Sequence, residues 1–113
     1  MKRIGYLASE IVKHGGICIV ANIAPYTEDR LYNKNLISQF GKYVQVYVNT
    51  SLEICEERDC KGLYQMARNG QIKNFTGISD PFEEPSESDL ILDGDNDLNH
   101  NVDLVIKLIK DNL

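Results

Sequence analysis

A segment between residues 61 and 78 carries positive charges, aromatic rings and glycines at short intervals. Cations can neutralise phosphate or sulfate oxygens, and an aromatic face can stack on a base. Glycines let backbone amides approach an anion closely and let a segment move as a lid. The residues of these three kinds are Lys61, Arg68, Lys73, Tyr64, Phe75, Gly62, Gly70 and Gly77. Two interpretations stay open at this point: a mobile lid that handles a nucleotide, or a helix-turn with ordinary surface charge.

Composition limits the class of protein. At 113 residues the chain is one domain or a piece of one, and its 42% hydrophobic content is enough to form a core. The net charge of −5 argues against a nucleic-acid binder, because duplex binding needs a basic surface. No apolar run approaches the ~20 residues of a membrane span. We therefore expect no membrane contact. Cys18, Cys55 and Cys60 lack metal-ligand spacing, so we expect free thiols, a cytoplasmic protein and no metal site.

The apolar pattern predicts helices and strands in alternation. An apolar face at helical spacing begins near Ile4 and stops at Gly15-Gly16, where His14 can interact with the helix C-terminus. Strands are expected where apolar residues run continuously, and helices where they recur at helical spacing. The expected strands span residues 17–23, 44–48 and 90–92, and the further helices span residues 28–40, 52–57 and 102–113. Asn49-Thr50-Ser51 offers an N-cap to the helix at residues 52–57, and His100 is expected on the surface before the last helix. This alternation is typical of a parallel α/β sheet.

In such a sheet, ligands bind beyond the carboxyl ends of the strands. Residues 22–26, 49–51 and 93–97 follow the three expected strands, so we expect them to surround one crevice beneath the lid.

Three motifs within residues 58–78 carry a family resemblance: R-D-x-K-G-L-Y from Arg58, A-R-x-G-x-I from Ala67, and F-T-G-I from Phe75. Together they resemble the lid region of adenylylsulfate (APS) kinases. The flanking segments agree, with I-A-P-Y from Ile23 and an arginine, Arg30, five residues after the proline. The resemblance covers essentially the whole chain. It implies a single domain over residues 1–113, with the lid at about residues 58–78.

This resemblance implies a P-loop kinase of sulfate assimilation that transfers the γ-phosphoryl group of MgATP to the 3′-hydroxyl of APS, which makes PAPS. Phosphoryl transfer depends mostly on positioning the two substrates and on cations that stabilise the spread-out charge, and the cations and aromatic residues of the lid segment could serve both purposes. By motif position, APS would be bound by Ile23, Ala24, Arg30, Lys61, Phe75 and Thr76. Arg58 and Asp59 would lie near the ATP adenine. No residue is assigned as certainly catalytic.

The sequence also departs from the family pattern. The chain contains no G-x-x-x-x-G-K-[ST], the loop that holds the ATP phosphates and a Mg²⁺ ligand, so Mg²⁺ would come with ATP and its ligands would not be in this chain. Ala24 stands where the family usually has serine. The run L-D-G-D-N from Leu92 is interpreted as a turn; a displaced substrate site and Mg²⁺ coordination by Asp93 or Asp95 are the alternatives.

The expected fold is therefore a P-loop-kinase-like three-layer α/β fold that lacks the P-loop strand and the second N-terminal strand and keeps three strands. In the family the missing P-loop strand lies between the strands that match residues 17–23 and 44–48, so the edges of these two strands that face each other would be unpaired. Three arrangements would cover these edges. The two strands could pair with each other, a second chain could cover them in a homodimer, or an N-terminal segment of a longer protein could lie between them; we expect the last. This chain alone would then be inactive. The alternatives are a non-catalytic APS/PAPS-binding regulatory or assembly module, and a kinase for another nucleotide-linked acid.

Overall fold

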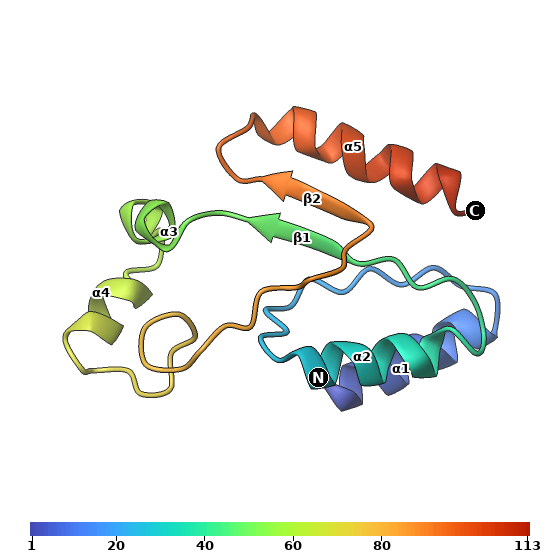
Figure 1. Cartoon of the computed structure of the whole chain (residues 1–113), viewed down its shortest axis with the longest axis horizontal. Coiled ribbons are helices and arrows are strands. Elements are labelled where there is room, and N and C mark those ends of the chain that lie inside the picture. The colour runs from blue at the N-terminus through green and yellow to red at the C-terminus, as the bar shows by residue number, and fades with distance from the viewer. The chain divides into compact units, whose positions relative to one another are not determined.

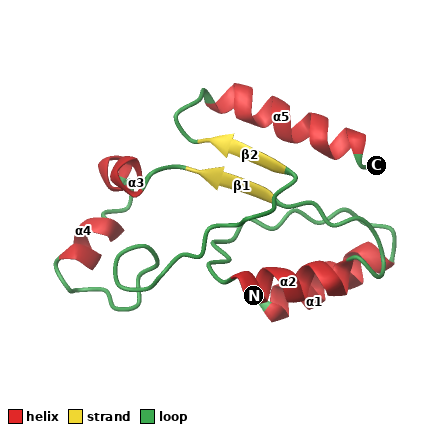
Figure 2. Cartoon of the chain, in the orientation of Figure 1, coloured by secondary structure: helices red, strands yellow, loops and turns green.

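The structure is a computed structural model that describes all residues from 1 to 113. Figures 1 and 2 show its helices and strands, which form an α/β arrangement. In chain order they are α1 (Lys2–Lys13), α2 (Thr27–Ile37), β1 (Val46–Asn49), α3 (Leu52–Arg58), α4 (Leu63–Arg68), β2 (Leu90–Asp93) and α5 (Leu98–Asp111). The chain divides into two compact units. The first is Met1–Val44 with Glu83–Pro85, and the second is Gln45–Phe82 with Ser86–Leu113.

The first unit is built on helices α1 and α2, which lie side by side (Figure 1). The two helices approach closely at Gly5, where an added Cβ would collide with the side chain of Asn33. The end of α1 follows the prediction. Gly15 adopts a left-handed φ of 86°, the Gly16 amide donates to the Ile11 carbonyl at 2.9 Å, and the ring of His14 contacts the Glu10 carbonyl at 2.8 Å.

The prediction of a strand at residues 17–23 is wrong. This segment has no strand partner, and its apolar side chains face outward: Ile17 is 64% exposed, Ile19 78% and Ile23 63%. A strand exists only where a neighbouring strand takes up its backbone N–H and C=O groups, and the structure supplies none here. Apolar composition alone therefore did not make this segment a strand.

The second unit holds a parallel sheet of two strands, not three. β1 pairs with β2 in register from Val46–Leu90 to Asn49–Asp93, and α5 packs along β2 (Figure 2). Leu92 is buried in this unit. Helix α5 begins at Leu98, so His100 lies inside the helix and not ahead of it as predicted.

Helices α3 and α4 follow β1 along the chain, and a long loop connects α4 to β2. Ser51 caps α3 as predicted, with its hydroxyl accepting from the Ile54 amide at 3.3 Å. Helix α4 is short and lies inside the predicted lid segment. None of the helices is long and apolar enough to cross a membrane.

Candidate functional site

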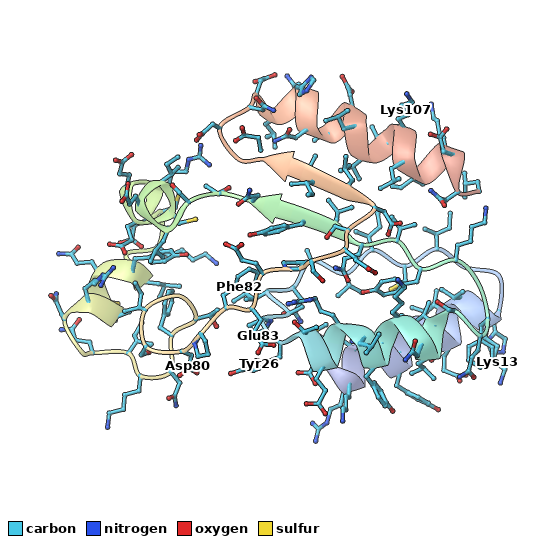
Figure 3. All side chains as sticks on the ribbon, viewed as in Figure 1. Lys13, Tyr26, Asp80, Phe82, Glu83 and Lys107 are labelled. Atoms are coloured by element: carbon cyan, nitrogen blue, oxygen red, sulfur yellow. The ribbon has the colours of Figure 1, made fainter.

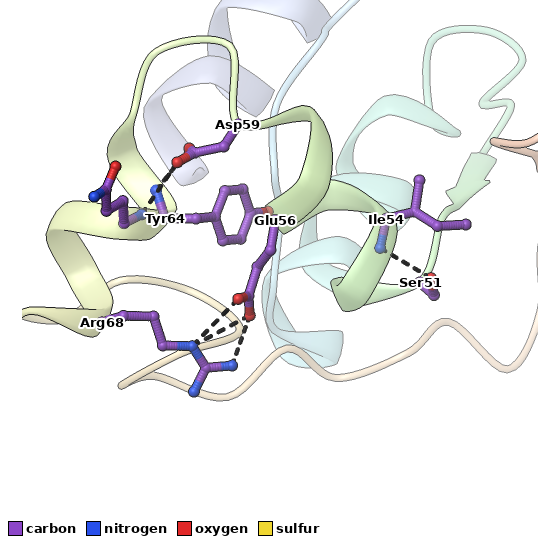
Figure 4. Close-up of polar contacts among 7 residues, drawn as sticks. Ser51, Ile54, Glu56, Asp59, Tyr64 and Arg68 are labelled. Carbon is purple, nitrogen blue, oxygen red and sulfur yellow. Dashed lines mark hydrogen bonds and ion pairs between the residues drawn. The ribbon is translucent and has the colours of Figure 1, made fainter.

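Asp59 organises the start of the predicted lid. It ends α3, and its two carboxylate oxygens accept from the amides of Tyr64 at 2.9 Å and Gln65 at 3.1 Å, in the first turn of α4 (Figure 4). Gly62 precedes α4 in the left-handed conformation, with φ 68°. A carboxylate at this end of a helix satisfies unpaired amides and complements the helix dipole. Asp59 therefore fixes how α4 leaves α3.

Tyr64 and Phe75 form an aromatic pair within the lid. Their ring centroids lie 4.9 Å apart in an edge-to-face arrangement. Burial raises the pKa of the Tyr64 hydroxyl, and the neighbouring Cys55, through its charge and a hydrogen bond, raises that pKa further. Phe75 is half-buried, so part of its ring surface stays accessible. An accessible aromatic face of this kind could stack on a base.

The loop after Phe75 is held by its own backbone. The Phe75 carbonyl accepts from three amides, those of Ile78, Ser79 and Asp80, at 2.9 to 3.1 Å. Thr76 forms a bridge with Asp80, and Gly77 adopts a φ of 88°, which only glycine takes without strain. The loop thus presents Phe75 and Thr76 in a defined backbone conformation.

The three cations of the lid differ in their partners. Arg68 forms an ion pair with Glu56, 2.6 Å between Nη2 and Oε1, which ties α4 to α3 (Figure 4). Its hydrogen bond with Glu56 and the charge of that carboxylate raise the pKa of Arg68. Lys61 and Lys73 are exposed and have no acidic partner. These two lysines, and not Arg68, are free to meet a ligand anion.

Arg58 connects α3 with the turn after β2. Its Nη2 donates to the Gly94 carbonyl at 2.9 Å, and the Gly94 amide donates to the Asn49 carbonyl at 3.0 Å. Gly94 also packs so closely on Thr50 that an added Cβ would collide with the threonine hydroxyl. Residues 49–51 and 93–97 therefore meet at the carboxyl end of the sheet, as predicted for this pair of segments.

The D-G-D-N run folds as a turn. The Asp93 carboxylate accepts from the Asp95 amide at 2.9 Å, and the Asp93 carbonyl accepts from the side chain of Asn101 at 3.0 Å. No group of three or more His, Cys, Asp or Glu side chains gathers in a way that could hold a metal ion. Mg²⁺ coordination by Asp93 or Asp95 stays an untested alternative, because Mg²⁺ that binds with a nucleotide often uses only one or two carboxylates.

Ala24 and Arg30 meet in the first unit. Ala24 has a φ of 45°, in the left-handed region, and its carbonyl accepts from Nη1 of Arg30 at 2.6 Å. Arg30 is buried, at 7% exposure, and Ile23 is exposed beside the loop. Glu83 joins them: its carbonyl accepts from Arg30 Nη2 at 2.7 Å, and its carboxylate accepts from the Thr27 amide at 2.7 Å. Figure 3 shows Tyr26 and Glu83, which lie at the start of α2.

The predicted site residues thus fall into two groups. Ile23, Ala24 and Arg30 belong to the first unit. The second unit holds Arg58, Asp59, Lys61, Phe75 and Thr76. The binding roles of both groups stay predictions, as does the single crevice.

Sequence reasoning did not identify Glu83 as a residue of the site. No sequence signal pointed to a distant cap, because a helix predicted from residue 28 would have Thr27 as its own local N-cap. Nothing in the sequence said which of the distant acidic residues would supply it.

Comparison with known proteins agrees with the lid motifs. The profile of the family described as adenylylsulphate kinase matches residues 1–93. A probable adenylyl-sulfate kinase of Bacillus subtilis is 43% identical over the whole chain, which spans 57% of that relative. The adenylyl-sulfate kinase of Bacillus velezensis is 47% identical over 82% of the chain and 47% of its own length. A Gibberella zeae protein named sulfate adenylyltransferase is 46% identical over 82% of the chain, but that match covers only 16% of the fungal protein.

The structural comparison gives the same family. The APS kinase of Mycobacterium tuberculosis, solved in complex with AMPPNP and APS, superposes with a TM-score of 0.90 at 34% identity. The match covers 96% of this chain and 64% of the mycobacterial one. The chain thus has the α/β fold of these P-loop kinases, over about half to two thirds of a kinase's length. The protein belongs to the adenylylsulphate kinase family.

Proposed function

We propose that this chain supplies the lid and part of the substrate wall of an adenylylsulfate kinase of sulfate assimilation. In the reaction, the γ-phosphoryl group leaves ATP as its bond to ADP breaks, and it joins the 3′-oxygen of APS, whose proton is lost; the product is PAPS. The observation that carries the proposal is the likeness, over 96% of the chain, to a kinase solved with both nucleotides.

The predicted site residues other than Arg30 have the following roles in this proposal. Lys61 is an unpartnered cation available to the phosphate or sulfate oxygens. Phe75 and Thr76, on their self-bonded loop, hold the adenosine of APS. Ile23 and Ala24 border the same ligand, and Arg58 and Asp59 lie near the ATP adenine while they join α3 to its neighbours. Mg²⁺ arrives with ATP, and no step is assigned to it through the residues of this chain.

A second candidate function is favoured by a sequence observation. These 113 residues contain no phosphate-binding G-x-x-x-x-G-K-[ST] loop. Without that loop, a chain could bind APS or PAPS and yet transfer nothing, as a regulatory or assembly module.

The test is isothermal titration of the 113-residue chain with APS, PAPS and MgATP, after circular dichroism has shown that it is folded. We expect the wild-type chain to bind APS saturably. The Phe75→Ala variant should bind APS about tenfold more weakly than the wild type, since one base–aromatic stack contributes ~1–3 kcal/mol. The matched control is Phe40→Ala, which removes an exposed aromatic ring outside the lid.

The outcomes separate the two candidates. A folded chain that binds neither APS nor PAPS contradicts both. Binding of APS or PAPS together with production of PAPS from MgATP supports the kinase. If no PAPS forms even when a kinase segment carrying the missing loop is supplied in trans, the binding module is the better description.

A further inference from the structure

Arg30 is a buried cation without a carboxylate partner. Its guanidinium donates to the Ala24 carbonyl at 2.6 Å, the Glu83 carbonyl at 2.7 Å and the Thr27 hydroxyl at 3.0 Å. The ion pair found in the structure is Arg68–Glu56, far along the chain in the other unit. Burying a charge costs several kcal/mol unless hydrogen bonds satisfy it. Two of the three acceptors of Arg30 are backbone carbonyls, so the chain must keep these carbonyls in place to satisfy the buried guanidinium.

The chain path at this point needs fixing because it is strained. Ala24 is not glycine, yet its φ is 45°, a conformation that costs ~1–3 kcal/mol and persists only when its surroundings impose it. Pro25 follows, and its carbonyl accepts from the Glu83 amide at 2.8 Å. The loop Ala24–Tyr26 is thus held from both sides.

Glu83 completes the arrangement. Its carboxylate caps α2 by accepting from the Thr27 amide at 2.7 Å, which the side chain of Tyr26 cannot do. Arg30, Glu83 and Thr27 therefore form one hydrogen-bonded cluster around the loop, which we name the loop clamp. An arginine suits this position, because its planar fork reaches several acceptors at once and a lysine ammonium does not.

We propose that Arg30 is a positioning residue that acts through the loop clamp and does not touch the nucleotide. The clamp holds Ala24 in its strained conformation, so that Ile23 and Ala24 form the wall against which APS binds. This inference rests on the proposed function, and it assigns Arg30 a role different from direct substrate binding.

The first experiment needs no ligand. Amide hydrogen exchange, followed by NMR on the 113-residue chain, reports two amides: that of Thr27, whose acceptor is the Glu83 carboxylate, and that of Glu83, whose acceptor is the Pro25 carbonyl of the clamped loop. We expect Arg30→Lys and Arg30→Met to accelerate exchange at both amides by about tenfold or more, while amides in the middle of α1 keep their rates. The matched control is Arg3→Met, an exposed arginine of the same unit. Unchanged rates at Thr27 and Glu83 would overturn the clamp.

The second experiment measures APS affinity for the same variants at low and high salt. If Arg30 positions the loop, Lys and Met weaken binding equally, by about tenfold, and the salt dependence of the dissociation constant stays that of the wild type. If Arg30 instead contacts the anion, Lys restores affinity and Met flattens the salt dependence, and the positioning role is overturned. If the wild type binds no APS, the proposed function fails and the positioning role falls with it; the exchange rates then still decide whether the clamp exists.

A second variant guards against misfolding of the Arg30 variants. Glu83→Ala removes the cap and leaves the carbonyl that Arg30 uses, so the Thr27 amide should exchange faster. Glu83→Gln keeps an accepting oxygen and should restore slow exchange. The control is Glu84→Ala in the same loop, since Glu84 makes no hydrogen bond or ion pair. If Glu83→Ala behaves like Glu84→Ala, the cap assignment is wrong.

Discussion

Tyr64 shows how much one residue of the lid depends on its neighbours. Its amide donates to Asp59, its ring meets Phe75 edge-on, and burial and Cys55 raise the pKa of its hydroxyl. These contacts come from α3, α4 and the loop after them. The motif residues of the lid thus hold each other in place, and not only a ligand.

The raised pKa predicts a pH dependence of stability. In the unfolded chain the Tyr64 hydroxyl ionises near pH ~10, while in the folded chain it stays protonated to higher pH. The stabilisation by the neutral hydroxyl is therefore fully present below about pH 10 and is lost as pH rises through the folded pKa. We expect the free energy of unfolding in urea to fall more steeply above pH ~10 for the wild type than for Tyr64→Phe.

The control for this experiment is Tyr6→Phe, since the Tyr6 side chain is 62% exposed on α1. That variant should follow the wild type across the whole pH range. If Tyr64→Phe also does so, the hydroxyl of Tyr64 is not in the environment described.

The helix pair α1 and α2 meets through a contact between unlike residues. Gly5 lies against the side chain of Asn33, whose Oδ1 is buried without a hydrogen-bond partner. An unsatisfied buried oxygen costs ~1–3 kcal/mol, so the packing here is compact but not fully satisfied. Neither residue stood out as a packing position in the sequence.

A double-mutant cycle tests this contact. Gly5→Ala should destabilise the chain by ~1–3 kcal/mol through overpacking, although alanine is the better helix former. Asn33→Ala removes both the obstacle and the unsatisfied oxygen, so the double variant should recover most of the loss. Urea unfolding of the four proteins measures the coupling. Simple additivity of the two single effects would show that the side chains do not meet.

The features that were predicted correctly from the sequence are determined by residues close to them in the chain. The glycine stop of α1 and the Ser51 cap of α3 are decided within a few residues, and the structure confirms both. The strand at residues 17–23 failed because a strand needs a partner, which no local pattern can supply. At the site, the motifs of residues 58–78 identified the family, whereas the clamp around Ala24 depends on Glu83 and could not be predicted from residues near Ala24 in the chain.

At the scale of the whole molecule, large apolar side chains remain on the surface. Residues 17–23 present Ile17, Ile19 and Ile23, each more than half exposed, in a segment without a strand partner. Such a segment can pair with another chain, and contiguous apolar surface promotes association.

We therefore expect the chain to associate as its concentration rises, and Ile19→Lys to suppress this association without lowering the unfolding midpoint. Sedimentation velocity over a concentration series measures it. Leu98→Lys is the matched control, since Leu98 is 74% exposed at the start of α5 and outside any extended apolar run. Equal association by the Ile19 and Leu98 variants would locate the association elsewhere.

The cap of α2 also sets an order of events in folding. Thr27 receives its cap from a residue 56 positions later in the chain. Closing a loop of that length costs conformational entropy before the hydrogen bond contributes any stabilisation. During synthesis, α1 and α2 can pair before Glu83 has been made. The first turn of α2, with the loop before it, is then among the last parts of the first unit to become ordered.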